Sequence, residues 1–305
     1  MATADSTTEQ VLTRVRATWR RLLEQPLVWL APTLVLLAVF QLYPMLEAVL
    51  MSFTDESLVR PGAEFVGIQQ YARLATDPEF WEMLRVTAVY AFSSVVLHVL
   101  LGLVLALAID YGVRRGLRGH LTTRVSVLLA WIVPGIIIGL VWKVMLVESQ
   151  FGAINHFLGL VGVGPVPFRS DPTLALASTI AAGTWRGTAF SMIMIYGGLQ
   201  RVPTRLYEAA RVDGAGRGHR LRHVTLPQLK SVLVVTTVLV TIYALNTFDL
   251  IFALTGGGPG RATQVLRLFM YQEAFQDYAL GRGPAIACAM PAAHPLLTCQ
   301  LLVPF

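Results

Sequence analysis

The segment from residue 200 to 230 holds the side chains that come nearest to forming a chemical site. Its run Asp213-Gly-Ala-Gly-Arg-Gly-His is rich in glycine, but it lacks the Gly-Lys-Ser/Thr ending of a phosphate-binding loop. His219 and His223 are four residues apart and would share a helix face, yet no third metal ligand lies nearby in the sequence. No nucleophile is paired with a base. We therefore expect no catalytic residue, no metal site and no bound nucleotide in this chain.

Other polar side chains lie inside long apolar stretches, where a charge near mid-membrane costs about 2.5–3.5 kcal/mol and usually faces a cavity or a partner. Arg186, between Trp185 and Gly187, has two interpretations. It lines a solute pathway, where an arginine over an aromatic ring holds hydroxyls or an anion, or it pairs with a carboxylate between two chains. The lone His98 is expected to be hydrogen-bonded structure. Further pathway candidates are Tyr243, Asn246, Thr247 and Asp249.

The composition requires a lipid environment for these residues. Of 305 residues, 55% are apolar and 14% are charged, whereas a soluble domain carries about 25% charged residues. The apolar excess and the two cysteines exclude a disordered chain and a disulfide scaffold. The sequence therefore predicts an integral membrane protein.

Uncharged runs of about 20 residues predict transmembrane helices, because lipid offers backbone groups no partner outside the helix. A further stretch is interrupted only by Arg186, and the last 23 residues are uncharged. The sequence thus predicts an all-α bundle of about six spans. They are Leu27–Leu46, Val86–Ile109, Val125–Trp142, Pro172–Gln200, Ser231–Phe248 and Gly283–Phe305.

Basic residues indicate the orientation of the bundle, since cytoplasmic loops carry an excess of Lys and Arg. The N-terminal segment, residues 111–124 and residues 200–230 carry fifteen of them, and the alternating loops carry seven. We therefore expect a cytoplasmic N-terminus, with residues 8–25 forming either a surface amphipathic helix or a solvated arm. This topology explains the net charge of +6 without a nucleic-acid partner.

The segment 200–230 also has the pattern of a helix–turn–helix on the cytoplasmic face. Pro203 suits a first helical turn, and Leu206, Ala209, Ala210 and Val212 continue it. Glycines at 214, 216 and 218 then break the helix. A second amphipathic stretch runs from Leu221 to Leu226 and is expected to stop at Pro227.

Three short motifs in this segment resemble the "EAA" signature of the permeases of binding-protein-dependent ABC importers. In that family the short helix docks into a cleft on a separate ATPase, which binds ATP and Mg, and transmits its closure to the spans. The resemblance assigns ATPase coupling to Glu208, Ala209, Ala210, Asp213, Gly214, Ala215, Leu226 and Pro227.

Other motifs are similar to the sugar branch of that family, which includes permeases for maltose and glycerol phosphate. They include Tyr43-Pro44, the stretch from Phe65 to Trp81, Pro134 and Trp142-Lys143. The branch places sugar contacts near Trp185–Gly187 and in the stretch from Tyr243 to Asp249. It also implies a contact with the binding protein at Gly256, Gly257, Gly258 and Pro259.

The resemblance implies the type I importer permease fold and a set of partners in a bacterial inner membrane. These are a second homologous permease, two ATPase subunits, an extracytoplasmic solute-binding protein or lipoprotein, and membrane lipid. Two alternatives stay open, an ion-gradient-driven secondary transporter and a non-transporting scaffold. The first would need acidic residues deep in several spans, but only Glu47 and Asp249 come near.

The sequence divides into an N-terminal segment (1–26), the permease domain (27–282) and an atypical tail (283–305). The tail contains both cysteines and four prolines, and each interior proline costs a helix about 3 kcal/mol. The resemblance ends near Gly283. A shifted reading frame would give such a tail, so the sixth span is expected to be malformed or absent.

Overall fold

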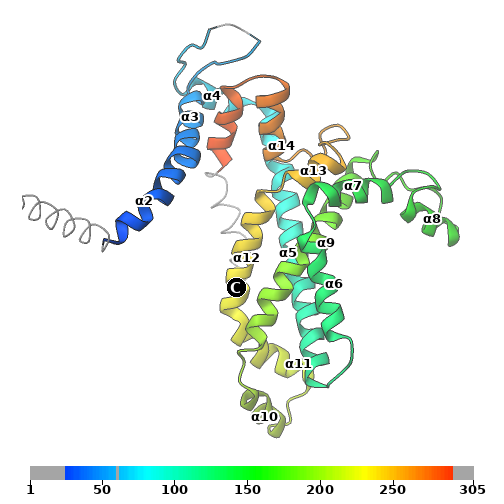
Figure 1. Ribbon diagram of the computed structural model, residues 1–305. Helices are drawn as coiled ribbons and strands as arrows, with labels where there is room; N and C mark the ends of the chain where they lie inside the picture. The colour runs from blue at the N-terminus through cyan, green and yellow to red at the C-terminus, as the bar shows by residue number, and fades with distance from the viewer. Residues whose placement is uncertain (1–24, 60–61, 291–305) are drawn as a thin grey trace, which may run out of the picture.

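The computed structural model describes residues 25–59 and 62–290, which fold almost entirely into helices (Figure 1). Within these residues no strand forms, and a single antiparallel bridge joins Thr54 to Phe65. Long helices run side by side through the centre, and short helices cover both ends (Figure 1). The predicted all-α bundle is confirmed. The predicted N-terminal segment lies almost wholly outside the described residues.

The first span stands apart from the other long helices (Figure 1). It consists of α2 (Pro26–Leu37), the π-helical turn η1 (Ala38–Leu42) and α3 (Tyr43–Met51). Its most apolar stretch is entirely unburied. A wide turn precedes Pro44, which has no N–H to continue the regular ladder. The span therefore continues to Met51, past the predicted end at Leu46.

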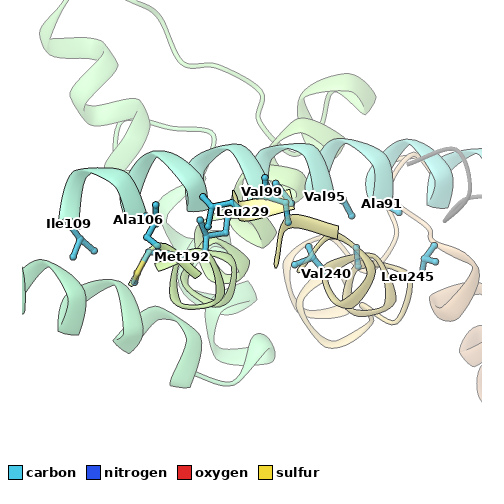
Figure 2. Packing of buried hydrophobic residues seen from close by; sticks show 13 residues of the cluster. Ala91, Val95, Val99, Ala106, Ile109, Met192, Leu229, Val240 and Leu245 are labelled. Carbon is cyan, nitrogen blue, oxygen red and sulfur yellow. The ribbon is translucent and has the colours of Figure 1, made fainter. Parts of the chain in front are cut away.

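Three long helices form the centre of the bundle: α5 (Pro78–Arg114), α9 (Pro172–Leu199) and α12 (Leu226–Leu245). At 1.5 Å per residue α5 is about 55 Å long, so it extends beyond a hydrocarbon layer of about 30 Å. The absence of a Cβ at Gly102 lets α5 approach Ser191 on α9 closely. The apolar core between the three helices includes Ala91, Val95, Val99, Met192, Leu229 and Val240 (Figure 2).

The predicted third span is broken in the structure. It forms α6 (His120–Ile132) and α7 (Gly135–Met145), which meet at an angle of 101°. Pro134 disfavours a helical conformation at the preceding residue, and Val133 accordingly has an extended ψ of 129°. The proline thus ends one helix and precedes the next, where the sequence predicted a single helix from Val125 to Trp142.

In the described residues three helices are long and apolar enough to cross a membrane, or four if the bent pair counts as one span. Helix α9 is not among them, although it runs unbroken through Arg186. Its buried faces carry many hydroxyl side chains, which lower its hydropathy. These are Ser178, Thr179, Thr184, Thr188 and Ser191.

Short helices lie beyond the ends of the bundle. At one end lie α10 (Thr204–Val212), α11 (Arg217–Arg220) and the π-helical turn η2 (Leu221–Thr225). Toward the other end lie the remaining helices (Figure 1). They are α4 (Gln69–Thr76), α8 (Ala153–Leu160), α13 (Asp249–Leu254), α14 (Leu266–Tyr271) and the π-helical turn η3 (Gln272–Gln276).

The chain forms a further helix over residues 282–290, where the described part ends. Ala285 and Ile286 are fully buried and pack in a cluster with Met83 and Phe269. The sequence predicted a malformed or absent sixth span from Gly283 onward, but the first turns of this helix are formed and packed. The rest of the predicted tail lies outside the described residues.

Candidate functional site

The predicted helix–turn–helix is present, and its turn is built on Gly214. This glycine has a φ of +76°, in the left-handed region that side chains with a Cβ rarely adopt. The Gly214 N–H donates to the Arg211 carbonyl at 3.0 Å, and the Ala215 N–H donates to the Ala210 carbonyl at 2.8 Å. These bonds satisfy carbonyls that the end of α10 would otherwise leave open. Asp213, Gly214 and Ala215 thus form the turn that the sequence predicted.

Helix α10 projects from the end of the bundle and has no buried residue (Figure 1). Glu208 and Ala209 are exposed, and Ala210 is half-buried. Val212, the last residue of α10, is 88% exposed. The small side chains let another helix approach closely. The face that carries the Glu-Ala-Ala motif is therefore open to a partner.

Leu226 and Pro227 lie in the first turn of α12. The sequence predicted that Pro227 would stop the preceding helix, but the helix runs on through it. Pro227 cannot donate to His223 and would crowd that carbonyl in a regular α-helix, and the wide turn η2 (Leu221–Thr225) precedes it. Helices α11 and α12 and the turn η2 between them are therefore one continuous, irregular helix from Arg217 to Leu245.

Arg186 forms an ion pair within its own chain. Its Nη1 lies 3.6 Å from Oδ2 of Asp249, the first residue of α13. The guanidinium carbon also lies 5.5 Å from the centre of the Tyr243 ring. Three of the predicted pathway residues are therefore in contact. This pairing within one chain differs from the predicted pairing between two chains, and both interpretations of Arg186 stay predictions.

A cavity of about 390 Å³ lies beside this ion pair, between α5, α6, α9 and α12. Gly187, Tyr243 and Asn246 are the predicted residues that line it. Trp185 is half-exposed and Thr247 is buried, and neither lines it. Its other walls include three residues that the pathway prediction missed, all of them from the predicted spans. These are His98, Trp131 and Phe190.

Gly187 contributes to the cavity through its missing side chain. A Cβ at this position would overlap the imidazole of His98, which is buried between α5 and α9. The Nε2 atom of His98 lies 3.1 Å from the Gly183 carbonyl, so the ring is held by the backbone of α9. His98 is therefore hydrogen-bonded, as the sequence predicted, and it also forms part of the cavity wall.

Asn246 caps the C-terminus of α12 and lies between the cavity and α14. Its amide donates to the Ile242 carbonyl at 2.7 Å. Arg267 donates to its backbone carbonyl at 3.0 Å and also contacts its side-chain oxygen. Asn246 thus joins α12 to α14 while facing the cavity.

The glycine-rich turn after α13 is folded against neighbouring loops. Gly256 and Gly257 have φ values of +63° and +96°, and the Thr263 hydroxyl donates to the Gly258 carbonyl at 2.8 Å. Gly258 and Pro259 line a cavity of about 290 Å³ together with Lys143, Arg169 and Ser170. The predicted contact residues Gly256–Pro259 therefore form a defined turn at the end of the bundle opposite α10 (Figure 1).

His219 and His223 face each other, with ring centres 4.0 Å apart. Within the described residues no three side chains of the His, Cys, Asp or Glu type come together as metal ligands do. The two histidines lie on the exposed basic stretch before α12.

Residues 98–297 match the family described as "Binding-protein-dependent transport system inner membrane component". The match extends past Gly283, although the resemblance in short motifs ends near that residue. The chain is 38% identical to the trehalose/maltose transport system permease protein MalF of Thermococcus litoralis, over 82% of both chains. It is 34% identical to the sulfoquinovosyl glycerol transport system permease protein SmoG of Agrobacterium fabrum, over 90% of this chain and 87% of that protein.

The fold is similar to that of a solved bacterial ABC transporter involved in the import of the acidic polysaccharide alginate. The TM-score is 0.78 at 20% identity, covering 95% of this chain and 96% of that one. The family is an inner-membrane one that works with a binding protein and an ATPase. The chain belongs to the family of binding-protein-dependent transport system inner membrane components, and it is a non-enzymatic permease subunit of an ATP-driven importer.

Proposed function

We propose that this chain translocates a carbohydrate or a related polar solute from an extracytoplasmic binding protein into the cytoplasm. The open face of α10 is the observation that carries the proposal, because a helix at the end of a bundle with no buried residue is placed for a partner. The names of the relatives support the solute class. They refer to trehalose and maltose, sulfoquinovosyl glycerol and sn-glycerol-3-phosphate.

The ATPase docks at residues 200–230, with α10 in its cleft. Glu208 supplies a negative charge for a basic partner residue, and Ala209 allows close approach of two helices. ATP and Mg are held by two partner ATPase subunits. Gly214 allows the chain to turn between α10 and the following segment, because glycine adopts the left-handed conformation at little cost.

The solute passes the cavity beside Arg186. Aromatic faces from Trp131, Phe190 and Tyr243 suit the apolar faces of a sugar ring, and Asn246 offers a donor and an acceptor to its hydroxyls. Such contacts are few and individually weak. A site of this kind releases its solute readily, which a transport pathway requires.

A second, homologous permease completes the pathway. The cavity is open on one side, and residues of its walls such as Trp131 and Ile242 are about half-exposed.

The basic loops support an N-terminus in the cytoplasm. Arg114 at the end of α5 stacks on Tyr207 of α10, and Arg217 of α11 stacks on Tyr111 of α5, so two of the basic segments share one end. The binding protein docks at the other end, near Gly256–Pro259.

The test of docking is a crosslink from Ala209→Cys to the ATPase, in a chain whose Cys288 and Cys299 are replaced by serine. We expect capture of the ATPase in membrane vesicles. The matched control, Gly159→Cys in α8, lies toward the other end of the bundle and should capture none. Failure of Ala209→Cys to capture a nucleotide-hydrolysing subunit would overturn the proposed docking.

The test of transport is uptake into vesicles supplied with ATP, the binding protein and candidate sugars. Asn246→Leu should abolish uptake while the ATPase still copurifies, because the change removes the polar contact in the cavity. Arg267→Gln, which frees Asn246 without removing it from the cavity, is the control and should retain most uptake. Uptake that persists without ATP and stops when ion gradients collapse would instead favour a secondary transporter.

A further inference from the structure

Tyr207 on α10 contacts two other helices at once. Its hydroxyl lies 3.2 Å from the Thr225 hydroxyl, at the last residue of η2 before α12. Its ring lies under the guanidinium of Arg114 at the end of α5, with 5.1 Å from Cζ to the ring centre. No other side chain of α10 makes a hydrogen bond, ion pair or ring contact to another helix in the part of the chain that the structure describes.

Arg114 is itself held in place. Its Nε donates to Oδ2 of Asp110 at 2.7 Å, one turn earlier on α5. Oδ1 of the same carboxylate accepts from the Gln200 amide at 3.2 Å, at the end of α9. Tyr207 therefore packs against a group that already connects the ends of α5 and α9.

Thr225 makes a second hydrogen bond besides its contact with Tyr207. It is buried, and its hydroxyl donates to the Arg220 carbonyl, at the end of α11, at 3.4 Å. A π-helical turn departs from the regular hydrogen-bond ladder, so it is a place where a helix can change direction. The Tyr207 hydroxyl thus meets the irregular turn that leads into α12.

The covalent connections of α10 to these helices differ. A short segment with the buried Val202 joins it to α9. The connection to η2 and α12 contains three glycines at alternate positions and is therefore conformationally permissive. To α5 there is no direct chain connection. A movement of α10 would reach α9 through the chain, but it needs a side-chain contact to reach α5 and α12.

We propose that Tyr207 is the positioning residue that joins α10 to α5 and α12, so that α5 and α12 follow α10 when the ATPase moves it. This inference rests on the proposed docking of the ATPase at α10. The hydroxyl of Tyr207 provides the connection to α12, and the aromatic ring provides the connection to α5.

The test uses the complete transporter in lipid vesicles, with ATP and Mg as the probe. Spin labels at Arg205→Cys on α10 and Lys230→Cys on α12, both exposed positions, report the separation of the two helices. Cys288 and Cys299 are replaced by serine. With Tyr207 present, ATP should leave the distance unchanged because the helices move together. With Tyr207→Phe, which keeps the ring over Arg114 and loses the hydroxyl, ATP should shift the distance.

Two further variants test whether the shift depends on the contact between the Tyr207 and Thr225 hydroxyls. Thr225→Val removes the other hydroxyl and should reproduce the shift of Tyr207→Phe, and the double variant should add nothing to either. Tyr111→Phe is the matched control, because Tyr111 stacks on Arg115 and Arg217 at the same end of the bundle and its hydroxyl forms no hydrogen bond with residues 25–59 or 62–290. It should behave like the unchanged chain.

Copurification of the ATPase separates the possible failures. If the unchanged chain never retains the ATPase, the proposed function fails, and Tyr207 is not in question. If the ATPase is retained but Tyr207→Phe shows the same distance as the unchanged chain with ATP, the inference about Tyr207 is wrong. Loss of the ATPase in Tyr207→Phe alone would also overturn it, because the side chain would then hold α10 folded and would not link it to the spans.

Discussion

Arg186 and Asp249 form an ion pair at 3.6 Å, 63 positions apart in the sequence, between the middle of α9 and the first residue of α13. The two side chains differ in exposure, with 17% for Arg186 and 43% for Asp249. A charge that loses its partner is more costly where water is scarce. The pair therefore stabilises the contact between α9 and α13 mainly by neutralising the arginine.

This asymmetry predicts unequal effects of removing either partner. Asp249→Asn leaves the more buried Arg186 uncompensated and should lower the free energy of unfolding by roughly 2–4 kcal/mol. Arg186→Gln leaves the more exposed Asp249 and should cost less. The double variant should show a coupling energy on the order of 1–2 kcal/mol. Thermal unfolding of the purified chain in detergent measures all three.

An exposed ion pair provides the control. Arg73 and Asp55 lie 3.7 Å apart with about half of each side chain exposed, so Asp55→Asn should cost under about 1 kcal/mol. If Asp249→Asn costs no more than Asp55→Asn, the pair beside the cavity does not stabilise the bundle.

A substitution at Gly135 is expected to disturb the ion pair between Arg186 and Asp249. A Cβ at Gly135 would overlap the Asp249 carboxylate and lie 2.6 Å from Nη1 of Arg186. Gly135→Ala should therefore separate the two charges and destabilise the chain by roughly 1–3 kcal/mol. Gly159→Ala in α8 has open space around its Cβ and should be neutral or stabilising by up to about 1 kcal/mol. Equal melting temperatures for the two variants would contradict the close approach of α7 to the ion pair.

Individual residues indicate how far the sequence predicts this structure. The long uncharged runs predict most spans, and Gly214 predicts the turn after α10, because both depend on local physics: burial in lipid and the conformations open to one residue. Motif comparison identified the segment that α10 forms. Local information was sufficient for these elements.

Other features depend on contacts that the sequence pattern does not encode. Proline is often tolerated within membrane helices, so the 101° break at Pro134 is not distinguishable in the sequence from a mild kink. The pairing of Arg186 with Asp249 requires α13 to fold back onto α9. The sequence also does not indicate the contact of Tyr207 with Arg114, because the two residues lie far apart in the sequence.

The contact of Gly102 with α9 predicts the effect of adding a side chain between α5 and α9. A Cβ there would lie 2.5 Å from Cβ of Ser191 and 2.9 Å from the backbone nitrogen of Met192. Backbone cannot move aside as a flexible side chain can, so Gly102→Ala should push α5 away from α9. We expect a loss of roughly 2 kcal/mol or more in unfolding free energy. Gly197→Ala, on an exposed face of α9, is the matched change and should leave the melting temperature nearly unchanged, because no heavy atom of the described residues lies within 4 Å of the added Cβ.

The hydrogen bonds of Glu148, which lies outside the spans, predict that the stability of the chain depends on pH. Its carboxylate accepts a hydrogen bond from the Ser170 hydroxyl and from the backbone N–H groups of Arg169 and Ser170, the latter two at 2.6 Å. These bonds lower the pKa of Glu148, with the Ser170 hydroxyl as the largest cause. A lowered pKa in the folded state means that the stabilisation is present above the unfolded pKa of about 4.3 and is lost as the pH falls through the folded value.

The expected result is a larger acid-induced fall in melting temperature for the unchanged chain than for Glu148→Gln. The difference should be small, because Glu148 is close to water and its interactions are screened. Ser170→Ala removes the largest cause and should give an intermediate curve. Glu273, whose pKa is raised chiefly by burial, contributes with the opposite sign, but it is common to all three chains and cancels in the comparison. Parallel melting curves from neutral to acidic pH would show that Glu148 does not fasten the loop before α9 to the end of α7.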